Sequence, residues 1–257
     1  MALVSTPESL EGTVALVTCA SSGIGEATAR CLADLGADVA LAARRQDRIE
    51  QLALDLADVR TAVIIADLSV RSEAERAVQQ AVGELGRLDI VINNAGVMLL
   101  GPIADAPVDE WDRMVQINVL GLLYVAKTSL PHLLAAAEDG RRQVADLVNV
   151  SSVAGRVVRL GSGVYNATKH AVGAFSESLR QEVTGRHVRV GLIEPGAVAT
   201  ELASHNRPEI QDGMRQRFAN MERLAAEDIA DAIGYMVTRP RHVVVNEMLV
   251  RPTEQQQ

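Results

Sequence analysis

The sequence predicts a single α/β domain, residues 1–257, in which helices cover both faces of one parallel sheet. Three observations support this prediction. Short β-branched, apolar runs alternate with longer stretches of helical periodicity along the chain. The runs at 14–17 and 62–65 are continuously apolar, as in strands that are buried on both sides. The chain is 48% hydrophobic and contains no linker, internal repeat or low-complexity tract, which suits one large core.

The elements follow one another in strand–helix order. The β-branched runs predict strands at 13–18, 38–43, 61–66, 88–93, 144–150, 188–193 and 243–250. The longer patterns predict helices at 24–35, 46–57, 73–85, 110–138, 164–183 and 227–237. In the 110–138 helix, Pro131 is the one strong internal stop signal. Residues 197–224 show no clear pattern, and because they are long for a loop we expect a lid or substrate-binding loop there.

Charge and cysteine content exclude several function classes. The net charge of −8 and the pI of about 5.2 argue against a nucleic-acid partner. Two cysteines, Cys19 and Cys31, do not make a disulfide framework, which favours a reducing cytoplasm. Residues 1–12 do not resemble a signal peptide, and we expect no segment with the roughly 20 apolar residues that a membrane span needs.

The first predicted strand ends in a turn that is typical of phosphate-binding loops. The turn reads Thr18-Cys19-Ala20-Ser21-Ser22-Gly23-Ile24-Gly25 and leads directly into a helix. Glycines at such a turn let the backbone approach a pyrophosphate, which then lies on the helix N-terminus. The hydroxyls of Ser21 and Ser22 add hydrogen-bond donors. The alternative is a tight strand–helix turn without a ligand.

The second predicted strand ends in Arg44 and Arg45, with no carboxylate beside them. A site selective for NAD places a carboxylate here for the ribose 2′-hydroxyl, whereas an arginine can bind a 2′-phosphate. The helix dipole disfavours cations at the start of the next helix, which favours a functional reason for this pair. The sequence therefore predicts NADP(H) rather than NAD(H). The alternative is a pair of solvated arginines.

Tyr165 and Lys169 are the most informative pair in the chain. The sequence has only three tyrosines and two lysines, and one of each lies four residues apart on the predicted 164–183 helix. This spacing places their β-carbons about 6 Å apart. A nearby cation lowers the pKa of a phenol from about 10 toward neutral pH, where proton transfer is most efficient. The pair therefore predicts an acid/base group. A surface Tyr–Lys pair is the alternative.

Together these motifs resemble those of the short-chain dehydrogenase/reductase family over nearly the whole chain. The family opens with Thr-Gly-x-x-x-Gly-x-Gly, which Thr18, Gly23 and Gly25 match, but Cys19 replaces the first glycine. Because a side chain is strained where the backbone needs a positive φ, we expect Cys19 to weaken cofactor binding. The resemblance implies a Rossmann fold, a doubly wound seven-stranded parallel sheet in the order 3-2-1-4-5-6-7.

The resemblance also implies a catalytic set. Ser152 precedes Tyr165 by thirteen residues, as in the family, and Asn118 matches a fourth member that anchors a water in a proton path. The implied reaction moves a hydride between nicotinamide and a carbonyl or alcohol carbon. Tyr165 donates the proton, Ser152 orients the oxygen, and Lys169 lowers the pKa of Tyr165 and holds the nicotinamide ribose. No metal is implied. The implied cofactor contacts are Thr18, Ser21, Ser22, Gly23, Ile24, Gly25, Arg44, Arg45, Asp67, Leu68, Asn94, Ala95, Gly96, Tyr165, Lys169, Pro195, Gly196, Val198 and Thr200.

Within the family, the chain is most similar to the clavulanate dehydrogenase type and to NADP-dependent dehydrogenases of serine and other 3-hydroxy acids. The stretches that carry this similarity are 43–45, 98–102, 193–196 and 246–253. We expect a small carbonyl or alcohol substrate and a homotetramer or dimer, because family members commonly associate through their long helices. The alternative is a catalytically weak NADP(H)-binding sensor, which we expect to lack Ser152, Tyr165 or Lys169. All three are present.

Overall fold

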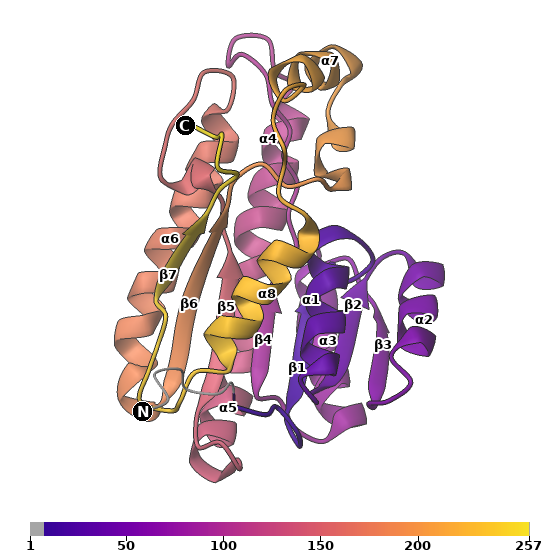
Figure 1. The fold of residues 1–257 in the computed structure, drawn as a ribbon, viewed down its shortest axis with the longest axis vertical. Coiled ribbons are helices and arrows are strands. Elements are labelled where there is room, and N and C mark those ends of the chain that lie inside the picture. Colours follow the sequence, from indigo (N-terminus) through magenta and orange to yellow (C-terminus); the bar gives the residue numbers. More distant parts are fainter. Residues whose placement is uncertain (1–7, 257) are drawn as a thin grey trace.

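A computed structural model describes residues 8–256 of the chain. Across these residues it contains one seven-stranded parallel sheet in the order β3-β2-β1-β4-β5-β6-β7, which confirms the predicted fold class and strand order (Figure 1). The strands are β1 (Val14–Thr18), β2 (Asp38–Ala43), β3 (Thr61–Ile65), β4 (Ile90–Asn93), β5 (Ala145–Val150), β6 (Val188–Pro195) and β7 (Glu247–Val250). The strand order reverses between β1 and β4, which is where ligands bind in sheets of this type.

Helices cover both faces of the sheet. On one face lie α1 (Gly23–Asp34), α2 (Gln46–Asp55) and α8 (Ala226–Val237). On the other face lie α3 (Arg71–Leu85), α5 (Leu122–Asp139) and α6 (Gly163–Val183). The shorter helices are α4 (Val108–Val115), α7 (Pro208–Arg217), the π-helical turn Gln116–Gly121, and the 3₁₀ turns Val153–Gly155, Thr184–Arg186 and Glu201–His205.

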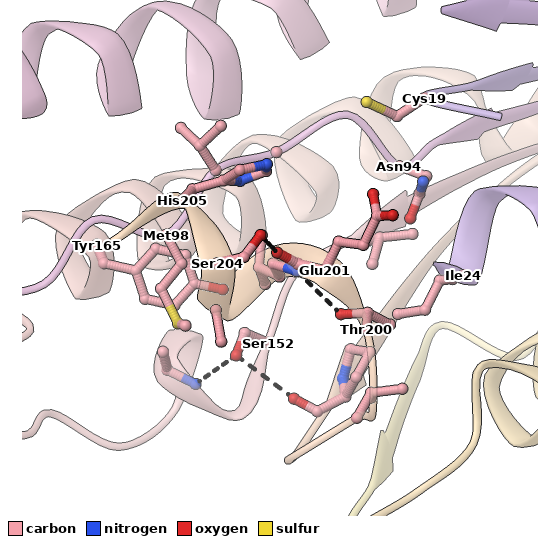
Figure 2. A pocket seen from close by; sticks show the side chains of 18 of the residues that line it. Cys19, Ile24, Asn94, Met98, Ser152, Tyr165, Thr200, Glu201, Ser204 and His205 are labelled. Atoms are coloured by element: carbon pink, nitrogen blue, oxygen red, sulfur yellow. Dashed lines mark hydrogen bonds between the residues drawn. The ribbon is translucent and has the colours of Figure 1, made fainter. Parts of the chain in front are cut away.

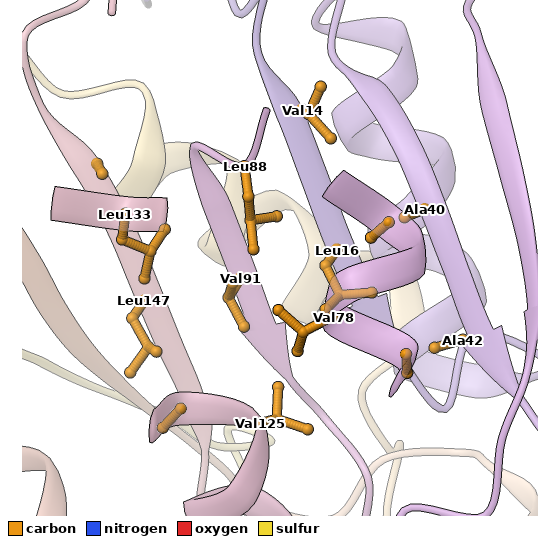
Figure 3. Close-up of a cluster of buried hydrophobic side chains, with 14 of the residues drawn as sticks. Val14, Leu16, Ala40, Ala42, Val78, Leu88, Val91, Val125, Leu133 and Leu147 are labelled. Atoms are coloured by element: carbon orange, nitrogen blue, oxygen red, sulfur yellow. The ribbon is translucent and has the colours of Figure 1, made fainter. Parts of the chain in front are cut away.

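The core forms two layers because successive strand residues point to opposite faces of the sheet. In β1, Val14 and Leu16 pack under α3 and α5 in the cluster of Figure 3, whereas Ala15 and Val17 pack under α1 and α8. All four side chains are buried. This burial on both faces explains why the strand sequences are continuously apolar instead of alternating.

Several element bounds differ from the predictions. The predicted 110–138 helix is longer, running continuously from Val108 to Asp139 as α4, the π-helical turn and α5. Strand β7 begins at Glu247, not at residue 243. The 197–224 segment contains a 3₁₀ turn and α7, which the sequence did not reveal. Over α7 the structure has no buried residue, so the segment lacks the apolar periodicity by which helices are recognised.

Among the described residues, Val108–Asp139 is the one helix that by length and composition could cross a membrane. The expectation that no segment is apolar enough was therefore too strict by composition alone. In the structure this helix packs against α3, β4 and β5, with Val125, Ala126 and Leu133 fully buried. Core helices of soluble proteins have the same composition, so this packing favours a core role.

Candidate active site

One deep cleft of about 950 Å³ opens at the carboxyl ends of the strands. Most residues predicted to act in catalysis or cofactor binding line it: Ser21, Ser22, Ile24, Arg44, Arg45, Asp67, Leu68, Asn94, Ala95, Gly96, Ser152, Tyr165, Lys169, Pro195, Gly196, Val198 and Thr200. Figure 2 shows Tyr165 and Ser152 toward one end and Cys19 and Asn94 toward the other. The cleft lining does not include four predicted residues, Thr18, Gly23, Gly25 and Asn118.

Tyr165 and Lys169 lie on the first turns of α6, and each side chain is only 6% exposed. The Lys169 Nζ is 5.9 Å from the centre of the Tyr165 ring and donates a hydrogen bond to the Val150 carbonyl, at 2.9 Å. The spacing argument therefore placed the two side chains correctly. The alternative of an exposed surface pair is excluded.

The pKa direction expected for Tyr165 is reversed in this structure. Burial raises the pKa of Tyr165 to about 12, and its interaction with the Ser152 hydroxyl opposes this rise. Burial also lowers the pKa of Lys169 to about 8. The charge of Lys169 lowers the pKa of a nearby phenol, but here the loss of water around both groups outweighs it, because desolvation disfavours the charged form of each. Tyr165 therefore holds its proton at neutral pH.

Ser152 follows β5 and caps the short 3₁₀ turn Val153–Gly155. Its hydroxyl accepts a hydrogen bond from the Ala154 amide, at 3.1 Å, and lies 3.4 Å from the Pro195 carbonyl as a donor (Figure 2). The hydroxyl is therefore fixed between the end of β5 and the end of β6, on the same wall of the cleft as Tyr165.

Asn118 lies in the π-helical turn, a form that occurs often at functional sites. Its amide both accepts from the Val97 N–H (2.8 Å) and donates to the Val97 carbonyl (2.9 Å), and it also donates to Thr168. A β-carbon on Gly96 would lie 3.4 Å from Asn118 Oδ1 and 3.7 Å from Lys169 Nζ. Asn118 thus ties the helix to the loop after β4 and to α6, directly behind the cleft.

The glycine-rich turn fits a dinucleotide in shape. A β-carbon on Gly25 would lie 2.3 Å from the Cys19 carbonyl oxygen and 2.6 Å from Asn94 Nδ2, so only glycine fits there. Gly23 has φ +55° and Cys19 has φ +54°, both in the left-handed region. Cys19 is therefore strained, as expected for a side chain at a turn glycine.

Thr18 holds the ends of β1 and β4 together. Its hydroxyl donates to the Ile92 carbonyl, at 3.1 Å, and accepts from the backbone N–H groups of Asn94 and Ala95, at 2.8 and 3.1 Å. It is 1% exposed, so its contribution to the cleft is the position of the Asn94–Ala95 backbone. Asn94 in turn donates from its side chain to the Thr18 carbonyl.

One carboxylate oxygen of Asp67 accepts hydrogen bonds from Ser69, from its backbone N–H at 3.0 Å and from its hydroxyl at 2.7 Å. Helix α3 begins at Arg71 with Val70 as its N-cap, so neither Asp67 nor Ser69 caps it. The other carboxylate oxygen of Asp67 lies 3.9 Å from the Arg44 guanidinium. Both side chains are partly exposed in the cleft.

Arg45 crosses the cleft and makes more contacts than the sequence predicted. Its Nε donates to Ser21 Oγ at 3.0 Å and its Nη2 to Ser22 Oγ at 2.5 Å. Its Nη1 binds the Glu201 carboxylate at 2.7 Å, and Arg48 binds the other oxygen of Glu201 at 2.8 Å. Arg48 and Glu201 were not predicted from the sequence. Glu201 lies 156 residues from Arg45 in the sequence, so no local sequence pattern indicates their contact.

The sequence predicted no role for Glu194. It is 1% exposed on β6, next to Pro195, and its two oxygens each accept from Arg156 Nε at 2.8 Å. Arg156 follows the turn that Ser152 caps and also pairs with Glu247 on β7. These two ion pairs of Arg156 therefore connect the turn after β5 to strands β6 and β7.

Arginines gather at the Tyr165 end of the cleft. Arg159 and Arg217 line the cleft, and Arg159 lies on the loop just before α6. The Nε and Nη2 atoms of Arg159 are buried without a hydrogen-bond partner within residues 8–256. Burial lowers the pKa of Arg159, and the charges of Arg217 and Arg251 lower it further. These three arginines have the chemistry of an anion-binding site.

The two ends of the cleft offer different chemistry. Within residues 8–256 no group of three or more His, Cys, Asp or Glu side chains could hold a metal ion. The glycine turn, the Ser21 and Ser22 hydroxyls and Arg45 offer a cradle for the phosphates of a dinucleotide at one end. Tyr165, Lys169 and Ser152 offer a proton donor and hydrogen bonds at the other.

Residues 13–211 match the sequence model of a family described as short chain dehydrogenase. The chain is 38% identical over 239 residues to an uncharacterized oxidoreductase of Staphylococcus aureus (strain MRSA252), with 93% of this chain and 96% of that protein covered. A solved closed form of serine dehydrogenase complexed with NADP+ is 32% identical, with a TM-score of 0.86 and coverage of 95% of this chain and 97% of that one. A 3-ketoacyl-(acyl-carrier-protein) reductase from Brucella melitensis complexed with NADH is 29% identical, with a TM-score of 0.81 and coverage of 94% and 98%. The matched residues span most of the chain, so the protein belongs to the short-chain dehydrogenase family.

Proposed function

We propose that this oxidoreductase uses NADP(H) to interconvert a carbonyl compound and the corresponding alcohol. The observation that carries the proposal is the position of Ser152, Tyr165 and Lys169 on one wall of a cleft whose other end is a glycine turn. A sensor on the same fold needs only the glycine turn. The complete hydroxyl, phenol and amine set favours an enzyme.

The chain's own residues supply the proton and the orientation. Tyr165 carries its proton at neutral pH because burial raises its pKa to about 12, so it can donate to an oxygen that becomes an alkoxide. Ser152 has a fixed hydroxyl that can hydrogen-bond the same oxygen. Lys169, held by the Val150 carbonyl, offers its remaining protons to ribose hydroxyls. The nicotinamide cofactor supplies or accepts the hydride.

The preference for NADP(H) rests on charge at the end of β2. Arg45 donates to the Ser21 and Ser22 hydroxyls and Arg44 lines the same cleft, and a 2′-phosphate binds strongly to such a set. Of the two solved relatives described above, serine dehydrogenase holds NADP+ and the ketoacyl reductase holds NADH, so the family alone does not choose. The arginines support NADP(H) for this chain.

The arginines at the Tyr165 end support a substrate that carries an acidic group. The unpartnered nitrogens of Arg159 are a costly arrangement unless a ligand satisfies them. An acidic substrate agrees with the similarity to serine dehydrogenase and with the predicted similarity to dehydrogenases of 3-hydroxy acids and of clavulanate. We also propose a cytoplasmic location and a homotetramer or dimer.

The test is to mix the purified protein with NADPH or NADH and paired carbonyl compounds, acetoacetate against ethyl acetoacetate and succinic semialdehyde against its methyl ester. We expect the absorbance of the reduced cofactor to fall faster with NADPH and with the acids. Tyr165→Phe should abolish turnover while leaving cofactor binding intact. Turnover in that variant would contradict the proposal, and binding without turnover in the wild type would favour the sensor.

A further inference from the structure

An ion-paired carboxylate lies where the cofactor's extra phosphate is expected to bind. Glu201, the first residue of the 3₁₀ turn Glu201–His205, lines the cleft together with Ser21, Ser22 and Arg45. The guanidinium of Arg45 contacts both serine hydroxyls and, on its remaining nitrogen, Glu201. Arg48 closes the set by binding the second carboxylate oxygen.

The chemistry of this set is that of a phosphate site. Two guanidinium groups and two hydroxyls suit an anion with several acceptor oxygens, and arginine forks bind carboxylate and phosphate with similar geometry. The three side chains of this set are accessible to solvent: Glu201 is 46% exposed, Arg45 41% and Arg48 45%. A competing anion can therefore reach the same guanidinium groups from solvent.

The contact also ties down the segment that follows β6. Glu201 belongs to the 197–224 segment, whereas Arg45 and Arg48 lie at the end of β2 and on α2, so the ion pairs join two sides of the cleft. Just before Glu201, the Thr200 methyl would lie 3.0 Å from a β-carbon added to Gly23. The segment thus rests on the glycine turn itself.

We infer that Glu201 is a residue that determines cofactor specificity: it competes with the cofactor's 2′-phosphate for Arg45 and Arg48, and the phosphate must displace it to bind. The inference rests on the proposed NADP(H) function and adds to it a built-in competitor. It predicts that Arg45 and Arg48 favour NADPH over NADH less strongly than they would if Glu201 were absent. It also predicts that the 2′-phosphate, and not the rest of the cofactor, releases the 197–224 segment.

The test uses isothermal titration of the full chain with two adenosine probes, adenosine 2′,5′-bisphosphate and AMP. Exposed ion pairs are weak, so removing two of them in Glu201→Gln should tighten bisphosphate binding about 3- to 30-fold at low ionic strength. AMP affinity should change less than about 2-fold by the same argument. The matched control is Glu209→Gln on α7, which removes a carboxylate of the same segment whose one ion pair within residues 8–256 is with Arg207, and it should bind both probes like the wild type.

Hydrogen exchange gives a second readout. Bisphosphate, but not AMP, should increase amide exchange in residues 201–224 of the wild type, and the Glu201→Gln variant should exchange faster there without a ligand. Unchanged or weaker bisphosphate binding in the variant, or an equal gain for AMP, would overturn the inference while leaving the proposed function standing. Weaker AMP binding would mean that Glu201 accepts a ribose hydroxyl and would overturn it too. If neither probe binds any protein, the proposed function fails, and the inference with it.

Discussion

The buried lysine makes the most quantitative prediction. Lys169 has a pKa of about 8 in the folded protein, against an ordinary value of 10.5. Between these values Lys169 binds more protons in the unfolded chain than in the folded chain, so its contribution to the free energy of unfolding rises with pH. For one group with these two pKa values, the rise from pH 8.0 to 9.5 works out at about 1.5 kcal/mol.

The measurement is urea unfolding of the wild type and of Lys169→Met at pH 8.0 and 9.5. Methionine keeps the apolar stem and removes the amine, so the rise should be absent in the variant. Tyr165 contributes in the opposite direction, because its folded pKa of about 12 lies above its ordinary value of 10.0, so its stabilisation declines as pH rises from about 10 to 12. This contribution is small below pH 9.5 and common to both proteins, so the difference between their pH dependences isolates Lys169.

The control is Lys127→Met, which removes the only other lysine, an exposed residue of α5. It should follow the wild type at both pH values. If the Lys169→Met protein shows the wild-type pH dependence to within about 0.5 kcal/mol, then Lys169 is not desolvated as the structure indicates. The explanation for the high pKa of Tyr165 would then be wrong as well, because both pKa shifts come from the same burial.

Three further predictions, two of them with a matched control variant, test the turn and the support around it. Cys19→Gly should stabilise the protein by about 1 kcal/mol, because glycine adopts φ +54° without strain, and should tighten NADPH binding; unchanged stability and affinity would show that the position tolerates a side chain. Gly25→Ala should weaken NADPH binding at least about 10-fold because its β-carbon has no room, whereas Gly83→Ala, which has open space on α3, should keep wild-type affinity. Glu194→Gln should lower the free energy of unfolding by about 1–3 kcal/mol through its buried pair with Arg156, and Glu247→Gln, more exposed, by less than about 1 kcal/mol; equal losses would contradict the burial argument.

The sequence predicted what local patterns determine. Strand burial on both faces left continuous apolar runs, so the strands of the sheet were placed within a few residues. The i, i+4 spacing of Tyr165 and Lys169 placed their side chains together because one helix carries both. The resemblance supplied Ser152 and the strand order, and the structure brings Ser152 to the same wall of the cleft.

What the sequence did not predict depends on contacts between distant segments. The pKa direction at Tyr165 follows from how much water the folded cleft excludes, which no spacing reports. Glu194 looked unexplained because its partner Arg156 lies on another strand connection. Helix α7 was missed because none of its residues is buried, so the segment carries no apolar period.

The charges of the cleft explain how an acidic chain can receive an anionic cofactor. The net charge is −8, yet the cleft places Arg45 and Arg48 at the phosphate end and Arg159 and Arg217 at the Tyr165 end. The buried Tyr165–Lys169 pair lies at the same end as Arg159 and Arg217, and desolvation there favours the neutral form of both groups. Arginines at both ends therefore attract anions, while burial keeps the proton on the Tyr165 phenol at neutral pH.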